Sequence, residues 1–131
     1  MAKIKLLIDT DVFIDYFNQG LFSEIVENGE FRIYYSVVTK KELLAKQGLR
    51  DLERRAILYE LRKHQIVNVT GDIADRYSSL LGEYPGMAKE DALIATTALH
   101  KRLPLLTRNW KHYRKINGLV LFGRPSVSTP R

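Results

Sequence analysis

The sequence predicts an α/β protein with a central, mainly parallel sheet. Short aliphatic and aromatic runs alternate along the chain with longer amphipathic stretches, which is typical of parallel strands joined by helices. The 131 residues, 45% of them apolar, suffice for one domain with its own core. We predict a single domain over residues 1–122 and a loosely ordered tail over 123–131, which holds two prolines and three Ser or Thr residues.

Five segments are predicted as strands. The first is an aliphatic run flanked by lysines and closed by Asp9, and the second is rich in aromatic and β-branched residues. Both features are typical of buried strands. In chain order the predicted strands are residues 4–8, 31–38, 66–69, 105–107 and 119–122.

Seven segments are predicted as helices, with Asp11 as the cap of the first. Glycines and prolines mark where several of them end, as at Asn28-Gly29, at Gly48 and at Pro85-Gly86. The segment that follows Pro85-Gly86 is apolar on most sides, so we expect it to be well buried. The predicted helices are residues 12–17, 22–27, 39–47, 52–63, 72–81, 88–102 and 110–116.

The charge is unevenly distributed. Residues 1–91 carry 13 basic and 15 acidic groups, whereas residues 92–131 carry 8 basic groups and no acidic one. The formal net charge is +6 and the pI is near 9.6. A wholly cationic last third predicts a polyanionic partner such as RNA, although a solvated basic face would give the same counts.

The chain has no cysteine, which excludes disulfides, thiolate nucleophiles and Cys-based zinc sites. The longest apolar runs are far shorter than the roughly 20 residues needed to span a bilayer. Lysines also interrupt the first residues too early for a signal peptide. We therefore expect a cytoplasmic protein with no membrane segment.

Polar side chains follow the predicted strands. Ligands of open α/β sheets gather at the carboxyl ends of the strands, so these side chains are expected to share one edge. Clustered carboxylates repel one another, which destabilises the fold unless a cation binds among them. The residues concerned are Asp9, Asp11, Ser36, Thr39, Glu42, Thr107, Arg108 and Asn109, with Asp91 near the start of a helix.

Carboxylate and hydroxyl oxygens without cysteine favour Mg²⁺ or Mn²⁺ over zinc. The histidines His64, His100 and His112 show no ligand spacing with one another. Carboxylate-held divalent ions activate water for phosphodiester cleavage. The acidic cluster and the basic last third together predict a metal-dependent nuclease.

Each acid also has a plainer explanation. A carboxylate at the end of a buried strand costs folding free energy unless it has a partner. This cost favours a functional role for Asp9. Thr39 and Glu42 have capping-box spacing, and on spacing alone this explanation is as good as a metal role. The helix dipole favours any acid at the place of Asp91, and Asp15 could orient a ligand or face solvent.

Four segments resemble the PIN-domain ribonucleases, most closely toxins of the VapC type. They are Leu7-Ile8-Asp9-Thr10-Asp11-Val12-Phe13-Ile14-Asp15, Ser36-Val37-Val38-Thr39-Lys40-Lys41-Glu42-Leu43, Asp91-Ala92-Leu93-Ile94-Ala95-Thr96-Thr97-Ala98-Leu99 and Leu106-Thr107-Arg108-Asn109-Trp110-Lys111-His112-Tyr113. They occur in the family's order and cover nearly the whole chain. The resemblance implies a three-layer α/β/α fold and a Mg²⁺- or Mn²⁺-dependent RNA endonuclease.

The resemblance also implies roles for individual residues. Asp9, Glu42 and Asp91 match the metal-binding acids, and Asn109 stands where the family often has a fourth acid. Polar positions near the site are matched by Thr10, Asp11, Ser36 and Thr107, and Lys89 and Arg108 are candidates for contacts with the RNA backbone. Implied partners are an RNA substrate, often transfer RNA, a cognate antitoxin that blocks the site, and a second copy in a homodimer.

Two other functions fit parts of the sequence. Asp9-Thr10-Asp11-Val12 also fits the signature of haloacid-dehalogenase-like phosphatases, in which Asp9 would be a nucleophile. The chain lacks the later acidic pair of those enzymes, since Lys89-Glu90-Asp91 is followed by no further carboxylate. A non-catalytic RNA-binding PIN module is the other alternative, and the presence of all three acids argues against it.

Overall fold

The computed structural model describes residues 2–123 and contains a four-stranded sheet of strand order β3-β2-β1-β4. All three strand pairs are parallel, as predicted. The strands are β1 (Ile4–Ile8), β2 (Phe31–Ser36), β3 (Gln65–Val67) and β4 (Leu105–Leu106).

The predicted fifth strand, residues 119–122, is wrong as an element. Within the described residues this segment forms an isolated parallel bridge between Leu105 and Leu121. The Leu105 N–H donates to the Val120 carbonyl, and the Phe122 N–H donates to the Leu105 carbonyl, both at 2.8 Å. Because β4 has two residues, it offers too short an edge for a longer ladder.

All seven predicted helices are present, with shifted ends. The largest shifts are at the ends of the third and seventh helices, which stop at Leu44 and Tyr113, three residues before the predicted ends, and the first helix begins at Thr10 rather than at Val12. None of the helices in the described range is long and apolar enough to cross a bilayer. The helices are α1 (Thr10–Gln19), α2 (Ser23–Val26), α3 (Val37–Leu44), α4 (Asp51–Leu61), α5 (Gly71–Glu83), α6 (Lys89–Lys101) and α7 (Trp110–Tyr113).

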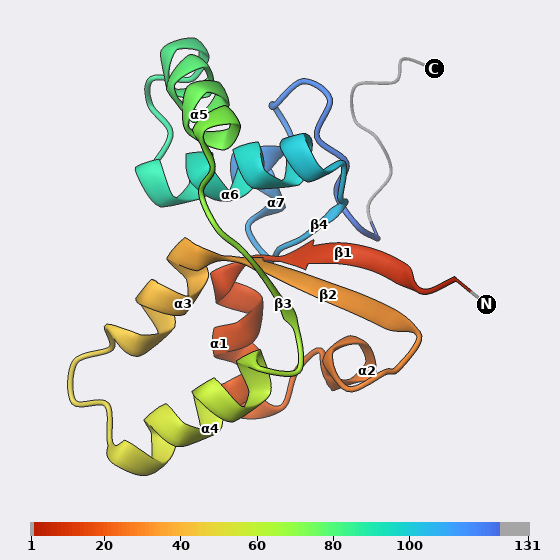
Figure 1. Cartoon of the computed structure of the whole chain (residues 1–131), viewed down its shortest axis with the longest axis vertical. Helices are drawn as coiled ribbons and strands as arrows, with labels where there is room; N and C mark the ends of the chain where they lie inside the picture. Colours follow the sequence, from red (N-terminus) through yellow and green to blue (C-terminus); the bar gives the residue numbers. More distant parts are fainter. Residues whose placement is uncertain (1, 124–131) are drawn as a thin grey trace.

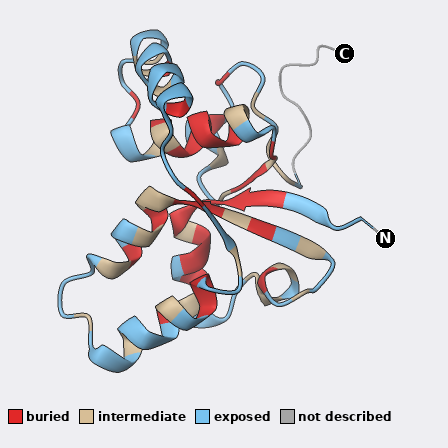
Figure 2. Ribbon diagram, viewed as in Figure 1, coloured by how far each residue is buried: buried red, intermediate tan, exposed pale blue. Residues whose placement is uncertain are grey.

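The helices cover both faces of the sheet, which confirms the three-layer arrangement. Helices α1 to α4 lie on one side of the sheet, and α5, α6 and α7 lie on the other (Figure 1). The alternation of side chains along β1 supplies both cores: Leu7 packs into the core beneath α5 and α6, while Leu6 and Ile8 pack into the core beneath α1 and α4. The carboxyl-terminal part of β1 and the sheet-facing side of α6 are buried (Figure 2).

The sheet also fixes what lies at its carboxyl edge. Ile8 of β1 pairs with Leu106 of β4, and the Asp9 N–H donates to the Leu106 carbonyl at 2.9 Å. Asp9 and Thr107, which directly follow β1 and β4, therefore lie side by side at this edge. Of the predicted tail, Gly123 is described, and residues 124–131 lie outside the described residues.

Candidate functional site

Asp9 lies at the junction of β1 and α1 and is 3% exposed. Its Oδ1 accepts a hydrogen bond from the Thr10 N–H at 2.8 Å, and its Oδ2 accepts one from the Thr107 hydroxyl at 2.7 Å. Asp9 is thus the N-cap of α1. The prediction that Asp11 caps this helix is wrong, because the helix starts directly after the strand and Asp11 falls in its first turn.

The surroundings of Asp9 disfavour its charge. Burial, followed by the nearby Asp11 carboxylate and, to a smaller extent, Asp91, raises the pKa of Asp9 to about 7. The hydrogen bonds from Thr107 and Thr10 act in the opposite direction. A cation beside these oxygens would favour the carboxylate form, since opposite charges stabilise each other.

Asp11 and Asp15 lie one turn apart on α1, and both contact Arg108 in the loop after β4. The Arg108 N–H donates to Asp11 Oδ2 at 3.2 Å, and Arg108 Nε lies 3.0 Å from Asp15 Oδ2. Asp15 is buried, so the structure contradicts a solvent-facing Asp15. Burial also raises the pKa of Asp11. The two acids tie the loop after β4 to α1.

Asp91 approaches the same edge of the sheet from the first turn of α6. Its Oδ1 accepts a hydrogen bond from the Tyr113 hydroxyl at 3.1 Å, and its Oδ2 lies 3.5 Å from His112 Nδ1. Tyr113 is fully buried, and its pKa is raised by burial and by the charges of Asp9 and Asp91. Asp9, Asp11 and Asp91 therefore lie at the same edge of the sheet, near enough for the charges of Asp11 and Asp91 to raise the pKa of Asp9.

Glu42 is exposed on α3 and reaches the site through Thr10. The Thr10 hydroxyl donates to Glu42 Oε1 at 2.6 Å, and the Thr39 hydroxyl lies 2.9 Å from the same Thr10 oxygen. The capping-box explanation of Glu42 is wrong. The cap of α3 is Ser36, whose Oγ accepts a hydrogen bond from the Val38 N–H at 3.2 Å, so Thr39 lies inside the helix.

Of the remaining predicted residues, Asn109 and Lys89 lie at the exposed rim of the site, and Ser36 is buried. Asn109 is exposed, and its backbone N–H donates to the Thr107 hydroxyl at 2.9 Å. Lys89 is exposed at the first position of α6. Within residues 2–123, no hydrogen bond or ion pair joins the side chain of Asn109, Lys89 or Ser36 to the acids. Ser36 has a structural role as a helix cap, and the roles predicted for the other two stay predictions.

The donors at this edge suit a hard divalent ion in their chemistry. They are carboxylate and hydroxyl oxygens, and Asp11 Oδ1 is a buried oxygen with no hydrogen-bond partner among the described residues. Over the same range, no three Asp, Glu, His or Cys side chains converge closely enough to hold an ion. The residue types therefore fit Mg²⁺ or Mn²⁺, while Glu42 is engaged with Thr10 rather than with Asp9 and Asp91.

The sequence does not predict the contact of Tyr113 with Asp91 or the pairing of Asp15 with Arg108. Tyr113 belongs to one of the four segments that carry the resemblance, but neither spacing nor composition distinguishes its hydroxyl from that of any core tyrosine. The pair of Asp15 and Arg108 joins residues from opposite ends of the chain. In sequence the signal was the spacing of Asp11 and Asp15, which places both acids on one face of a helix.

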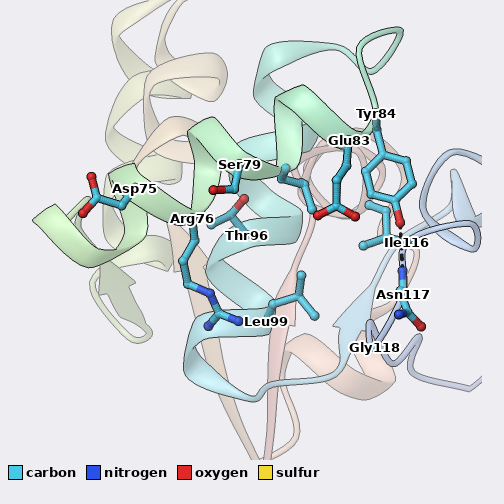
Figure 3. Close-up of a pocket in the computed structure, with 11 residues that line it drawn as sticks. Asp75, Arg76, Ser79, Glu83, Tyr84, Thr96, Leu99, Ile116, Asn117 and Gly118 are labelled. Atoms are coloured by element: carbon cyan, nitrogen blue, oxygen red, sulfur yellow. Dashed lines mark hydrogen bonds between the residues drawn. The ribbon is translucent and has the colours of Figure 1, made fainter.

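Hollows in the described part of the chain also lie away from Asp9 and Asp91. One of about 520 Å³ lies between α5, α6 and the loop after α7 and contains none of the predicted site residues (Figure 3). Another, of about 340 Å³, lies between α1, α3 and α4 and reaches Glu42. Its apolar lining consists of Ile14, Phe17, Leu43, Leu49, Ala56 and Ile57, with Asn18, Lys46 and Glu53 also at its walls.

Residues 6–118 match the PIN domain family. The chain belongs to the PIN domain family. This PIN domain is 30% identical over 127 residues to Ribonuclease VapC1 of Methanocaldococcus jannaschii, an alignment that spans 92% of this chain and 88% of that protein. It is 33% identical over 119 residues to Ribonuclease VapC19 of Mycobacterium tuberculosis, with 82% of this chain and 90% of that one covered.

Solved structures share the architecture of this PIN domain. A toxin–antitoxin complex from Klebsiella pneumoniae contains a chain that is 29% identical, with a TM-score of 0.69 over 88% of this chain and 95% of that one. A chain of a DNA-bound VapBC complex from Salmonella typhimurium is 19% identical, with a TM-score of 0.75 over 90% of this chain and 96% of that one. The second likeness concerns the fold alone.

Proposed function

We propose that this PIN domain is a divalent-metal-dependent endoribonuclease and the toxin of a toxin–antitoxin pair. The observation that carries the proposal is the buried Asp9 carboxylate, held at the end of β1 beside Asp11 and Asp91. Relatives named as VapC ribonucleases, aligned over most of their length, support RNA as the substrate. Family membership leaves the phosphatase alternative without support.

Asp9 and Asp91 are the residues we propose to hold Mg²⁺ or Mn²⁺, with Asp11 adjacent. A bound ion of this kind supplies an activated water and offsets charge on the pentacoordinate phosphate. Thr107 and the Thr10 N–H fix the two oxygens of Asp9. Glu42, held by Thr10, would bind the ion or orient the attacking water.

The substrate-facing surface is proposed to lie around the loop after β4. The Arg108 side chain is 54% exposed although it is paired with Asp15, so its outer face remains available to a phosphate. Lys89 is exposed at the start of the helix that carries Asp91. Both cations would contact the RNA backbone, Asn109 would belong to the catalytic site, and transfer RNA is a candidate substrate.

The antitoxin is proposed to bind the apolar groove between α1, α3 and α4. This groove opens beside Glu42 and exposes Ile14, so an amphipathic segment lying in it would end at the acidic cluster. The toxin–antitoxin complex from Klebsiella pneumoniae supports a partner of this kind. We also propose that the chain forms a homodimer and is located in the cytoplasm. Light scattering of the purified chain tests whether it is a dimer.

RNA cleavage in the presence of Mg²⁺, Mn²⁺ or EDTA tests this function. We expect cleavage with either metal and none with EDTA. The new ends should carry no 2′,3′-cyclic phosphate, because water rather than the neighbouring 2′-hydroxyl attacks. Cyclic phosphate ends that persist in EDTA would contradict the mechanism. Binding of RNA without cleavage would favour the non-catalytic module, and a phosphate trapped on Asp9 would favour the phosphatase.

A further inference from the structure

The one-turn helix α7 holds both oxygens of the Asp91 carboxylate. The Tyr113 hydroxyl donates to Oδ1 at 3.1 Å, and His112 Nδ1 lies 3.5 Å from Oδ2. The two contacts differ in rigidity. The His112 side chain is 62% exposed, whereas Tyr113 is fully buried in the core formed with α6. The tyrosine is therefore the firmer of the two anchors.

The buried hydroxyl of Tyr113 requires a partner. A phenol oxygen in a packed core costs free energy unless it is hydrogen-bonded, and the bond that satisfies it here goes to Asp91. The ring beneath it is locked by neighbouring apolar side chains of the same core. The direction in which the hydroxyl points is thus set by packing, and it constrains a carboxylate that is itself partly exposed.

We propose that Tyr113 is a positioning residue, whose hydroxyl holds the Asp91 carboxylate turned toward Asp9 so that the two acids are prearranged to share a divalent cation. The inference rests on the proposed function and adds to it a residue that acts through Asp91. Partners that orient a metal ligand commonly change metal affinity or activity by roughly 10- to 100-fold when removed. In Tyr113 the group that would orient Asp91 is the hydroxyl oxygen alone.

Replacement of Tyr113 by phenylalanine removes only that oxygen and keeps the ring in the core. The full-length variant is titrated with Mn²⁺ in the absence of RNA, by calorimetry or by electron paramagnetic resonance of free Mn²⁺. We expect Mn²⁺ affinity to fall roughly tenfold. In cleavage assays, half-maximal activation should need a correspondingly higher Mg²⁺ concentration, while the KM for RNA stays unchanged.

Tyr35→Phe is the matched control. Tyr35 is also buried, and its hydroxyl donates to the Leu61 carbonyl at 3.3 Å, away from the acids. We expect this variant to lose a hydrogen bond without any change in Mn²⁺ affinity. An equal loss of affinity in both variants would mean that general destabilisation is responsible, and it would overturn the positioning role.

A second measurement needs no variant. In the wild-type chain labelled on its tyrosine rings, addition of Mg²⁺ should shift the resonance of Tyr113 and leave that of Tyr35 in place. Unchanged or tighter Mn²⁺ binding by Tyr113→Phe, or no shift of the Tyr113 resonance, overturns the inference while the proposed function stands. Failure of the wild-type chain to bind Mn²⁺ and to cleave RNA overturns both.

Discussion

Thr10 Oγ1 lies 2.6 Å from Glu42 Oε1, and this hydrogen bond joins the first residue of α1 to α3 across 32 positions of the chain. Thr10 directly follows Asp9, the cap of α1, and its backbone N–H donates to the Asp9 carboxylate while its hydroxyl donates to Glu42. Asp9 and Glu42 are therefore linked through one neutral residue.

Thr10→Val should lower kcat for RNA cleavage about tenfold, because removal of the hydroxyl releases Glu42 while the shape of the side chain is kept. Single-turnover cleavage measures the effect. Thr97→Val is the control, since the Thr97 hydroxyl is also buried but donates to the Leu93 carbonyl within α6. Equal rates for Thr10→Val and the wild type would argue against the coupling.

Glu42→Gln should abolish most of the cleavage activity and leave the melting temperature unchanged. Glu42 is exposed and does not cap its helix, so neutralising it costs little stability, while a carboxylate at the site is lost. Cleavage rates and thermal unfolding are measured on the same preparation. Glu83→Gln, an exposed substitution on α5, is the control. Full cleavage activity of Glu42→Gln would show that the Glu42 carboxylate has no role in catalysis.

The stability of the metal-free chain should depend on pH through Asp9. The pKa of Asp9 in the folded chain is raised to about 7 from 3.8. Folding therefore favours the protonated form of Asp9. The contribution of Asp9 to the free energy of unfolding is fully present below about pH 4 and is lost as the pH rises through 7. At pH 8 in EDTA, Asp9→Asn should exceed the wild type in unfolding free energy by on the order of 2 kcal/mol.

Urea unfolding of both proteins at several pH values measures this difference. We expect the advantage of Asp9→Asn to shrink steadily between pH 8 and pH 5. Added Mn²⁺ should stabilise the wild type more at pH 8 than at pH 6, because protons and the cation compete for the same carboxylate. A difference that is constant with pH would show that Asp9 titrates normally.

Arg108→Ala should destabilise the fold by about 1–3 kcal/mol, because it leaves the buried Asp15 carboxylate without its cation. The double variant Arg108→Ala with Asp15→Asn should recover most of that loss in thermal unfolding. RNA affinity separates the two roles of Arg108. We expect RNA affinity to stay reduced in the double variant. A full recovery of RNA affinity would show that Arg108 does not contact RNA and serves only in the ion pair with Asp15.

Much of the fold follows from local sequence patterns. The aliphatic run before Asp9 is typical of a buried strand, and polar residues that follow parallel strands are expected to meet at one edge of the sheet. These patterns place Asp9 and Asp11 at one edge, whereas Asp91 stands at the start of a helix and its role at the site was implied by the family resemblance. Element ends are less well defined by such patterns, and Asp11 was therefore predicted as the cap in place of Asp9.

The remaining errors arise from tertiary contacts. Glu42 has capping-box spacing after Thr39, but Ser36 already satisfies the start of α3, so Glu42 is free to turn toward Thr10. Tyr113 acquires its role only when α7 docks on α6 and brings its hydroxyl to Asp91. No local pattern records that docking, because its partner lies 22 positions away.

The role of Asp9 in metal-dependent cleavage is tested most directly by cleavage of RNA with Mg²⁺ by wild-type protein and by Asp9→Asn, purified in parallel. Asn keeps the size and the capping capacity of Asp9 but removes the buried charge. We expect cleavage by the wild type and a loss of at least about 100-fold in Asp9→Asn, on the order expected for removal of a metal ligand. Equal cleavage by the two proteins would contradict this role of Asp9.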